Sequence, residues 1–128
     1  MRAIAELDII DTGIVRELMG VVADSDNKFM RELLDAFVRD ATAALERMRR
    51  SVLANDAPSL AREAHRLKGS SATVGAVRLA AICFVMERSA KSGICHGLEA
   101  RVDAALEILD ATRVGLAQFF RGSIAEAA

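Results

Sequence analysis

Apolar side chains recur at steps of three and four residues along one long segment, and this pattern constrains the fold more than any other feature. The positions are Phe29, Leu33, Phe37, Ala41, Leu45, Met48 and Val52. At 3.6 residues per turn, they form one continuous stripe along a single face of an α-helix. Because such a stripe must be covered, we expect a long amphipathic helix packed against other elements.

Composition favours an all-α chain with one domain. The sequence has 128 residues, an aromatic content of 4% without Trp or Tyr, and a single Pro. Aromatic residues favour strands, whereas the abundant Ala and Leu lose little entropy in a helix, so composition argues against an all-β domain. Two domains would each bury a core with about 60 residues, which is near the practical minimum. We therefore expect one domain over residues 1–122 and a disordered tail over 123–128.

Capping residues and helix breakers mark where the first two helices begin and end. A short first helix is expected over residues 11–20, with Asp11 as its cap and Gly20 at its end. Ser25 or Asp26 can cap the long second helix, and Asn55-Asp56 ends it. The short N-terminal helix thus precedes a much longer amphipathic one.

Three further helices follow the Asn55-Asp56 break. Pro58 suits the first turn of a third helix that runs towards Thr73, and Gly75 separates this helix from a fourth. Ser92-Gly93 closes the fourth helix, and the fifth begins near Gly97. Short connections between long helices predict an antiparallel up-down four-helix bundle with an additional short N-terminal helix. The inward-facing residues of the fourth helix are Leu79, Ile82, Cys83, Met86 and Ala90. The fifth helix shows apolar residues at helical spacing, namely Leu98, Val102, Ala105, Leu109, Leu116 and Phe119.

The balance of charges argues against binding to nucleic acid or to an anionic membrane. The chain has 17 basic and 18 acidic residues, which gives a net charge of −1 and no basic excess to attract phosphate groups. Its longest strongly apolar stretch without a charged residue, 79–86, is far shorter than the roughly 20 residues of a membrane span. No apolar segment of signal-peptide length follows Met1. These features predict a cytoplasmic protein without membrane insertion.

The two cysteines, Cys83 and Cys95, are too few for a disulfide framework, and we interpret them as free and buried. The neighbouring Cys95-His96 raises the question of zinc. A zinc site needs three or four ligands at suitable spacing, and the whole chain holds 2 Cys and 2 His. We expect no metal site and no bound cofactor.

A helical wheel of the third helix separates three faces. One face is expected to be buried, and it holds Leu60, Ala64, Leu67 and Ser71. The opposite flank is charged and polar, and it holds Arg62, Glu63, Arg66 and Ser70. A third strip lies between these two, and it holds Ala61, His65, Lys68, Gly69 and Ala72. His65 is therefore the one large ring on a strip of small residues.

This strip is unusual for a solvent-exposed helix face because Gly69 lies one turn after His65. Glycine inside a helix costs about 0.5–1 kcal/mol relative to alanine, so Gly69 needs a physical reason. Without bulky neighbours, the imidazole can be approached by another protein, with Lys68 beside it on the same face. A neutral imidazole nitrogen is a nucleophile near pH 7, and a lysine can stabilise a phosphoryl group placed on it. Spacing alone leaves open that His65 is an ordinary surface histidine and that Gly69 marks a bend.

The segment Ala64-His65-Arg66-Leu67-Lys68-Gly69-Ser70-Ser71-Ala72, followed by Val74-Gly75, resembles the signature of histidine-containing phosphotransfer (HPt) domains. That signature reads A-H-x-L-K-G-S-S-A around the phosphorylated histidine. The N-D-x-x-x-L-x-x-x-A-H approach and the R-L-A-A-I-C-x-x-M-E run after Gly75 are also similar to the family. The resemblance covers about residues 7 to 120 and implies a four-helix bundle with an extra N-terminal helix.

The resemblance also implies roles for individual residues. His65 would accept a phosphoryl group from the aspartate of a response-regulator receiver domain and pass it to another receiver. Lys68 would be its electrostatic partner, and Gly69 would give the receiver room. Ser71 is interpreted as structural, with its hydroxyl bonded to a carbonyl of its own helix.

In the fourth helix, many family members have a Gln that hydrogen-bonds the histidine or its phosphate. The nearest counterpart here is Glu87, with Lys91 one turn further on. Because a glutamate repels phosphate, we expect Glu87 instead to orient the unphosphorylated imidazole, with Lys91 as a second candidate for an orienting role.

The residues after Gly75 are Ala76-Val77 rather than the Lys-Ser/Thr of a phosphate-binding loop, so we expect neither ATP binding nor autophosphorylation. The isolated domain would be a phosphocarrier rather than an enzyme, and the partner receiver would supply Mg²⁺. Apolar residues at the end of the first helix and the start of the second are candidates for a receiver-docking patch, and capping of the bundle is an equal alternative for them: Leu18, Val21, Val22 and Phe29.

Three functional hypotheses remain at this stage. The leading one is a phosphorelay intermediate, either free-standing or the C-terminal module of a hybrid sensor kinase, which is monomeric when isolated. Its partners would be receiver domains and a sensor histidine kinase. The second is a helical adaptor that regulates a receiver or another enzyme without phosphotransfer, and the third is a plain structural bundle.

Overall fold

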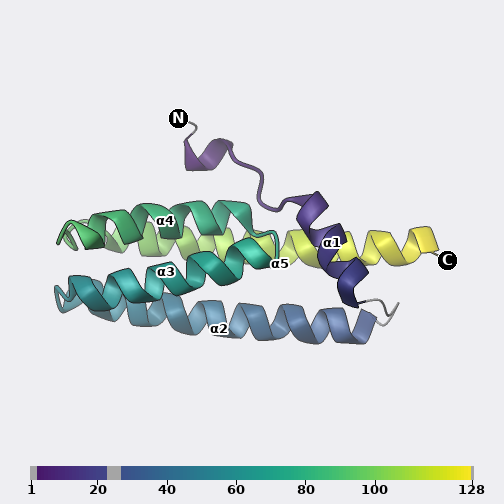
Figure 1. The fold of residues 1–128 in the computed structure, drawn as a ribbon, viewed down its shortest axis with the longest axis horizontal. Helices are drawn as coiled ribbons and strands as arrows, with labels where there is room; N and C mark the ends of the chain where they lie inside the picture. Colours follow the sequence, from purple (N-terminus) through teal and green to yellow (C-terminus); the bar gives the residue numbers. More distant parts are fainter. Residues whose placement is uncertain (1–2, 23–26, 128) are drawn as a thin grey trace.

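The computed structural model describes residues 3–22 and 27–127, and the regular elements found there are all helical. Helices α2 to α5 lie side by side as an antiparallel four-helix bundle, and α1 crosses one end of it (Figure 1). The predicted fold class is confirmed, and a short 3₁₀ helix precedes α1. The elements are η1 (Ile4–Glu6), α1 (Thr12–Val22), α2 (Asn27–Leu53), α3 (Ala57–Thr73), α4 (Val77–Lys91) and α5 (Glu99–Ala127).

The main core lies between α2, α3, α4 and α5. Its largest fully buried side chains include Leu45 and Met48 from α2, Leu60 from α3 and Leu79 from α4. Helix α3 packs against both α2 and α4, so its two flanks face different neighbours. The buried residues of α3 are the four that the wheel predicts: Leu60, Ala64, Leu67 and Ser71.

A smaller cluster closes the end of the bundle beneath α1. There Val15 packs with Met30 and Leu34 of α2 and with Leu116 and Phe120 of α5. The fully buried face of α2 therefore begins at Met30. The predicted stripe is wrong at Phe29, which is 49% exposed, whereas Leu33 is half-buried and packs against this cluster.

A similar one-residue difference occurs near the end of α5. Phe120 is buried there, whereas Phe119, which belongs to the apolar spacing noted in the sequence, is half-buried, packs against this cluster and lies beneath the guanidinium of Arg16. Neighbouring residues of a helix differ in direction by about 100°, and the position of α1 decides which of the two is covered.

Side-chain caps fix two helix starts, of which the cap at Asp11 was predicted. The Asp11 carboxylate accepts a hydrogen bond from the backbone N–H of Ile14 at 3.1 Å, and that of Asp56 accepts one from Ser59 at 3.2 Å. Gly75, at φ +80°, connects α3 to α4, and its carbonyl accepts a hydrogen bond from the N–H of Asp11. A Cβ on Gly75 would lie 2.9 Å from Val15 Cγ2, so this glycine lets α1 approach the α3–α4 turn.

Other predicted boundaries differ from those observed. Helix α1 continues past Gly20 to Val22, since Gly20 does not adopt the positive φ of a helix-ending glycine. Helix α5 starts at Glu99, and it continues to Ala127 through most of the tail predicted to be disordered. The Ala and Glu residues of that tail have high helix propensity. The predicted caps Ser25 and Asp26 lie outside the described residues.

Candidate functional site

A single carboxylate on α4, that of Glu87, contacts three side chains: His65, Lys68 and Lys91. Glu87 lies on α4 and is 2% exposed, and its Oε2 is 2.7 Å from His65 Nδ1. Its Oε1 accepts a hydrogen bond from Lys68 Nζ at 2.6 Å, and Lys91 Nζ lies 3.1 Å from Oε2. The structure thus brings together four residues that the sequence singled out, two from α3 and two from α4.

The hydrogen bond to Glu87 determines where the proton of a neutral His65 resides. A carboxylate only accepts hydrogen bonds, so Nδ1 must carry the hydrogen. The lone pair is then on Nε2, the other ring nitrogen. The His65 side chain is 66% exposed, whereas Glu87 beneath it is almost fully covered. This arrangement presents a nucleophilic nitrogen to whatever approaches the α3–α4 face.

The charge of Glu87 is stabilised by its neighbours. Burial would raise the pKa of this carboxyl group, but hydrogen bonds from Lys68, Lys91 and His65 outweigh it and lower the pKa to about 2. The carboxyl group is therefore ionised at neutral pH. It stabilises positive charge on the imidazole and on the two ammonium groups around it.

Gly69 leaves open space on the side of His65 that faces the α3–α4 turn. A Cβ built at this position would meet nothing within 4 Å, so packing inside the chain does not require a glycine. The neighbouring Ala72 is exposed and Ala61 is half-buried. Because the glycine weakens the helix without relieving any internal contact, the space is available to a molecule outside the chain.

Ser71 is buried as predicted, but its predicted hydrogen bond is absent. Its Oγ has no hydrogen-bond partner, which contradicts the expected bond to a carbonyl of the same helix. Ser70 and Thr73 make such bonds instead, to the carbonyls of Leu67 and Gly69. Helical spacing brings a serine near these carbonyls, but the side-chain rotamer decides whether the bond forms.

Two residues next to the site were missed by sequence reasoning. Phe84 of α4 is 45% exposed, with Lys68 Nζ at 5.4 Å from its ring centroid. The guanidinium carbon of the exposed Arg88 lies 5.8 Å from the same centroid. A signal was present in the sequence, since Phe84 is a large apolar residue that does not belong to the inward-facing set of the fourth helix.

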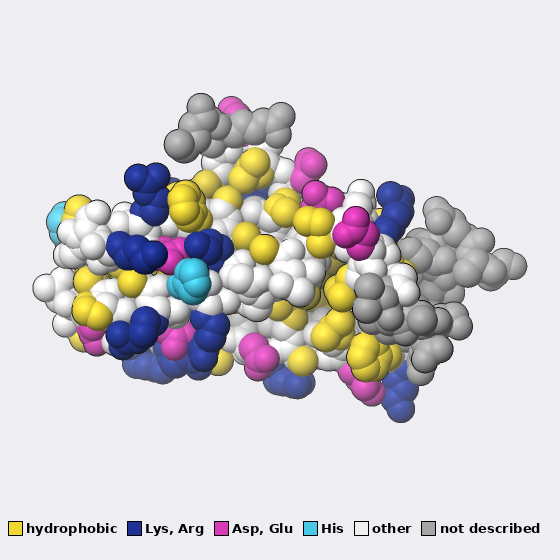
Figure 2. All heavy atoms as spheres, in the orientation of Figure 1, with side chains coloured by type: hydrophobic (Ala, Val, Ile, Leu, Met, Phe, Trp, Pro, Cys, Tyr) yellow, Lys and Arg dark blue, Asp and Glu magenta, His cyan; other side chains and the backbone are white. Residues whose placement is uncertain are grey.

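Basic side chains gather on this side of the molecule. Figure 2 shows Lys and Arg side chains around a histidine over α3 and α4, in the half of the bundle away from α1. The cations within reach of Glu87 and Phe84 are Lys68, Lys91 and Arg88. Lys68 is thus one of several cations beside His65.

The sequence also singled out a docking patch and two cysteines. Val21 and Val22, from the predicted docking patch, have side chains outside the described part of the structure, and Leu18 is half-buried. Cys83 and Cys95 are free and buried. Burial and the nearby Glu87 carboxylate raise the pKa of the Cys83 thiol to about 12, so it stays protonated at neutral pH.

Among the described residues, no three His, Cys, Asp or Glu side chains are grouped so that they could hold a metal ion. None of the helices, as far as the chain is described, is long and apolar enough to cross a membrane.

Comparison with known proteins identifies the family. The Hpt domain profile matches residues 32–118, a region that contains His65, Lys68, Gly69 and Glu87. The chain belongs to the Hpt family. Hpt domains take part in histidine phosphotransfer in two-component phosphorelays, where they interact with receiver domains and kinases and act as phosphocarriers rather than kinases.

A solved structure supports the assignment to the Hpt family. Histidine-containing phosphotransfer protein B from Pseudomonas aeruginosa PAO1 is 28% identical, with a TM-score of 0.78. The match covers 91% of this chain and 97% of that protein. A search of curated proteins returned no significant match.

Proposed function

We propose that His65 accepts a phosphoryl group on Nε2 from the aspartate of one receiver domain and passes it to the aspartate of another. The observation that carries this proposal is the 2.7 Å contact between His65 Nδ1 and the buried Glu87, on an imidazole that is 66% exposed. The contact leaves the lone pair on the accessible nitrogen. Phosphoryl transfer depends mainly on positioning and on charge stabilisation, and a rigid helix supplies the first of these.

Transfer of the phosphoryl group to His65 is a single displacement at phosphorus. The Nε2 lone pair attacks the phosphorus of the aspartyl phosphate, the bond from phosphorus to the aspartate oxygen breaks, and the aspartate leaves as a carboxylate. The ring keeps its proton on Nδ1 and becomes positively charged, beside the ionised Glu87. In the onward step, the electron pair of the P–N bond returns to Nε2 as the next aspartate takes the phosphoryl group.

Lys68 and Gly69 contribute to the same step. Lys68 lies one turn after His65, where its ammonium group can stabilise the added phosphoryl charge, and Glu87 holds it there until then. Gly69 leaves the space that the receiver needs above the helix. The receiver contributes its aspartate, its own lysine and Mg²⁺, which stabilises the developing negative charge.

The adaptor hypothesis is less well supported by this geometry. An adaptor that only binds a receiver does not need an exposed imidazole with one nitrogen held by a buried, ionised carboxylate. Ion networks of this kind are costly to bury and are concentrated at functional sites. A plain structural bundle has still less use for the open space at Gly69.

The test follows a labelled phosphoryl group. A receiver domain is phosphorylated with ³²P and mixed with the protein in the presence of Mg²⁺, and the label on the protein is tested for acid lability and alkali stability. We expect labelling of the wild type and none of His65→Gln. A matched control, His96→Gln, changes the other histidine, which is exposed next to the buried Cys95, and should be labelled like the wild type. Equal labelling of His65→Gln and wild type, or labelling of neither by any receiver that binds, contradicts the proposal.

A further inference from the structure

Phe84 is an exposed aromatic residue on α4, one helical turn before Glu87. It lies one residue after the fully buried Cys83, yet its side chain points away from the core and is 45% exposed. The other large apolar side chains that are exposed in the described part of the chain lie elsewhere: Phe29 and Leu53 near the ends of α2, Ile94 in the α4–α5 connection and Val114 on α5. An apolar side chain exposed beside a functional site is a candidate for contact with a partner.

Lys68 connects Phe84 directly to the site. Its Nζ lies 5.4 Å from the Phe84 ring centroid while it donates a hydrogen bond to Glu87, which in turn contacts His65. Arg88 lies over the same ring. Phe84, Arg88 and Lys91 thus lie around the Lys68–Glu87 pair beside His65, and we call the surface that they form the α4 surface.

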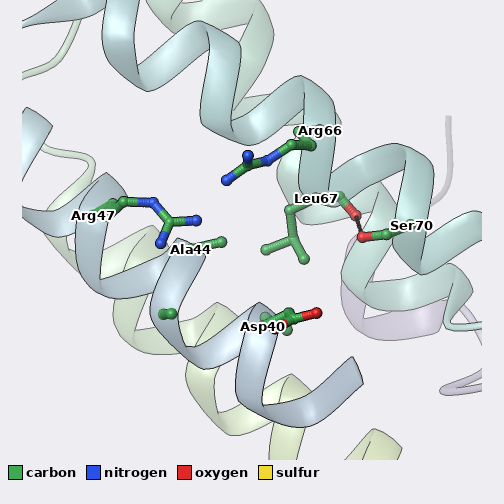
Figure 3. A pocket seen from close by; sticks show the side chains of 8 residues that line it. Asp40, Ala44, Arg47, Arg66, Leu67 and Ser70 are labelled. Atoms are coloured by element: carbon green, nitrogen blue, oxygen red, sulfur yellow. Dashed lines mark hydrogen bonds between the residues drawn. The ribbon is translucent and has the colours of Figure 1, made fainter. Parts of the chain in front are cut away.

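The two flanks of His65 differ in charge. On the α4 side, there are three cations, Lys68, Arg88 and Lys91, and one carboxylate, that of Glu87. On the α2 side, α2 and α3 form a groove of about 390 Å³, lined by Asp40 and Arg47 of α2 and by Arg66 of α3 across from them (Figure 3). Both arginines are also bound by Glu63, at 3.1 Å and 2.8 Å. Positive charge is thus in excess around Glu87 on the α4 side and balanced within this α2–α3 groove.

An aspartyl phosphate is anionic, so its approach is favoured over the flank with excess positive charge. The α4 surface offers an apolar ring between cations, and an aromatic residue in such a place gives a large contact area at low entropic cost. The complementary receiver surface has an apolar side chain beside an acidic one.

We infer that Phe84 is a receiver-contact residue, with Arg88 and Lys91 pairing with acidic groups of the receiver. This inference rests on the proposed function for the identity of the partner. It assigns Phe84 to partner binding and not to the chemical step. Replacing Phe84 should therefore change the concentration of receiver needed for transfer and not the rate at saturation.

Binding is measured by isothermal titration of a receiver domain into variants in the His65→Gln background, in which no transfer occurs. Burial of the exposed half of the ring predicts that Phe84→Ala raises the Kd by about tenfold to thirtyfold. Phe84→Leu keeps an apolar contact and should bind within about threefold of the parent. Ile94→Ala is the matched control, since Ile94 is 43% exposed and lies beyond the end of α4, and it should leave the Kd unchanged.

A parallel transfer assay in the presence of His65 separates binding from chemistry. We expect Phe84→Ala to raise KM and to leave kcat within about twofold, and Arg88→Glu to slow association most strongly at low salt. An unchanged Kd for Phe84→Ala, or an equal loss in Ile94→Ala, overturns the inference. A fall in kcat with an unchanged KM also overturns it, because the ring would then act only by placing Lys68. If the receiver binds but no phosphoryl group is transferred, the proposed function is refuted. The comparison of Kd values then still decides whether Phe84 contacts the receiver.

Discussion

Replacing Glu87 with Gln removes one charge from the buried network and keeps nearly the same volume. The pKa of Glu87 is about 2 in the folded protein, against an ordinary value of 4.5, so folding favours its ionised form. At about 1.36 kcal/mol per pKa unit, the difference corresponds to about 3 kcal/mol at neutral pH. Two partners, His65 and Lys91, are each 66% exposed, and screening by solvent reduces this figure to about 1–2 kcal/mol.

The sign of the pH dependence follows from the lowered pKa. The stabilisation is fully present above pH 4.5, which is the pKa of Glu87 in the unfolded chain. It is lost as the pH falls through about 2, the pKa of Glu87 in the folded protein. At pH 7, we expect the free energy of unfolding of Glu87→Gln to be about 1–2 kcal/mol lower than that of the wild type. More than half of this difference should be gone at pH 3, because the unfolded wild type then takes up a proton and the variant cannot.

The measurement is urea unfolding followed by circular dichroism between pH 7 and pH 3, with wild type and variant side by side. The other carboxyl groups are present in both proteins, so their contributions cancel when the two free energies of unfolding are subtracted. Glu107→Gln, at an exposed position on α5, is the matched control, and its free energy of unfolding at pH 7 should lie close to that of the wild type. A Glu87→Gln difference that is the same at pH 7 and pH 3 would refute the ionised network.

Four other changes test separate features. Gly69→Ala should stabilise the fold by about 0.5–1 kcal/mol in urea unfolding, whereas the larger Gly69→Leu should slow phosphotransfer; transfer at the wild-type rate by the Leu variant would show that the space is not used. Ser71→Ala should be neutral or stabilising by about 1 kcal/mol, because it removes a buried hydroxyl without a partner; a loss of stability would show that the hydroxyl is bonded. Gly75→Ala should destabilise by more than about 1 kcal/mol, because of its positive φ and its approach to Val15; unchanged unfolding would contradict this packing. Lys68→Ala should slow phosphotransfer and leave the circular dichroism spectrum unchanged; unchanged rates would remove its assigned role.

The arrangement of α3 could be predicted from sequence because it depends on one local rule. A period of 3.6 residues places Leu60, Ala64, Leu67 and Ser71 on one face, and all four are buried. His65 and Gly69 then fall outside the core on the same reasoning. The capping roles of Asp11 and Asp56 are equally local, since each involves a residue three positions further along the chain.

Features that depend on how helices lie against one another could not be predicted in this way. Contact between Glu87 and His65 requires the register of α4 against α3, and spacing within one helix does not determine it. The burial of Met30 in place of Phe29 depends on where α1 crosses α2. The absent hydrogen bond of Ser71 depends on a side-chain rotamer.

The central claim is that Nε2 of His65 carries the phosphoryl group because Glu87 holds the proton on Nδ1. Phosphorus and nitrogen NMR of the ¹⁵N-histidine-labelled protein, after transfer from a phosphorylated receiver, identifies the bonded nitrogen directly. We expect a single phosphohistidine with phosphorus coupled to Nε2 of His65 and a proton on Nδ1. Phosphorus bonded to Nδ1, or a phosphoryl group on any residue other than His65, would contradict the account.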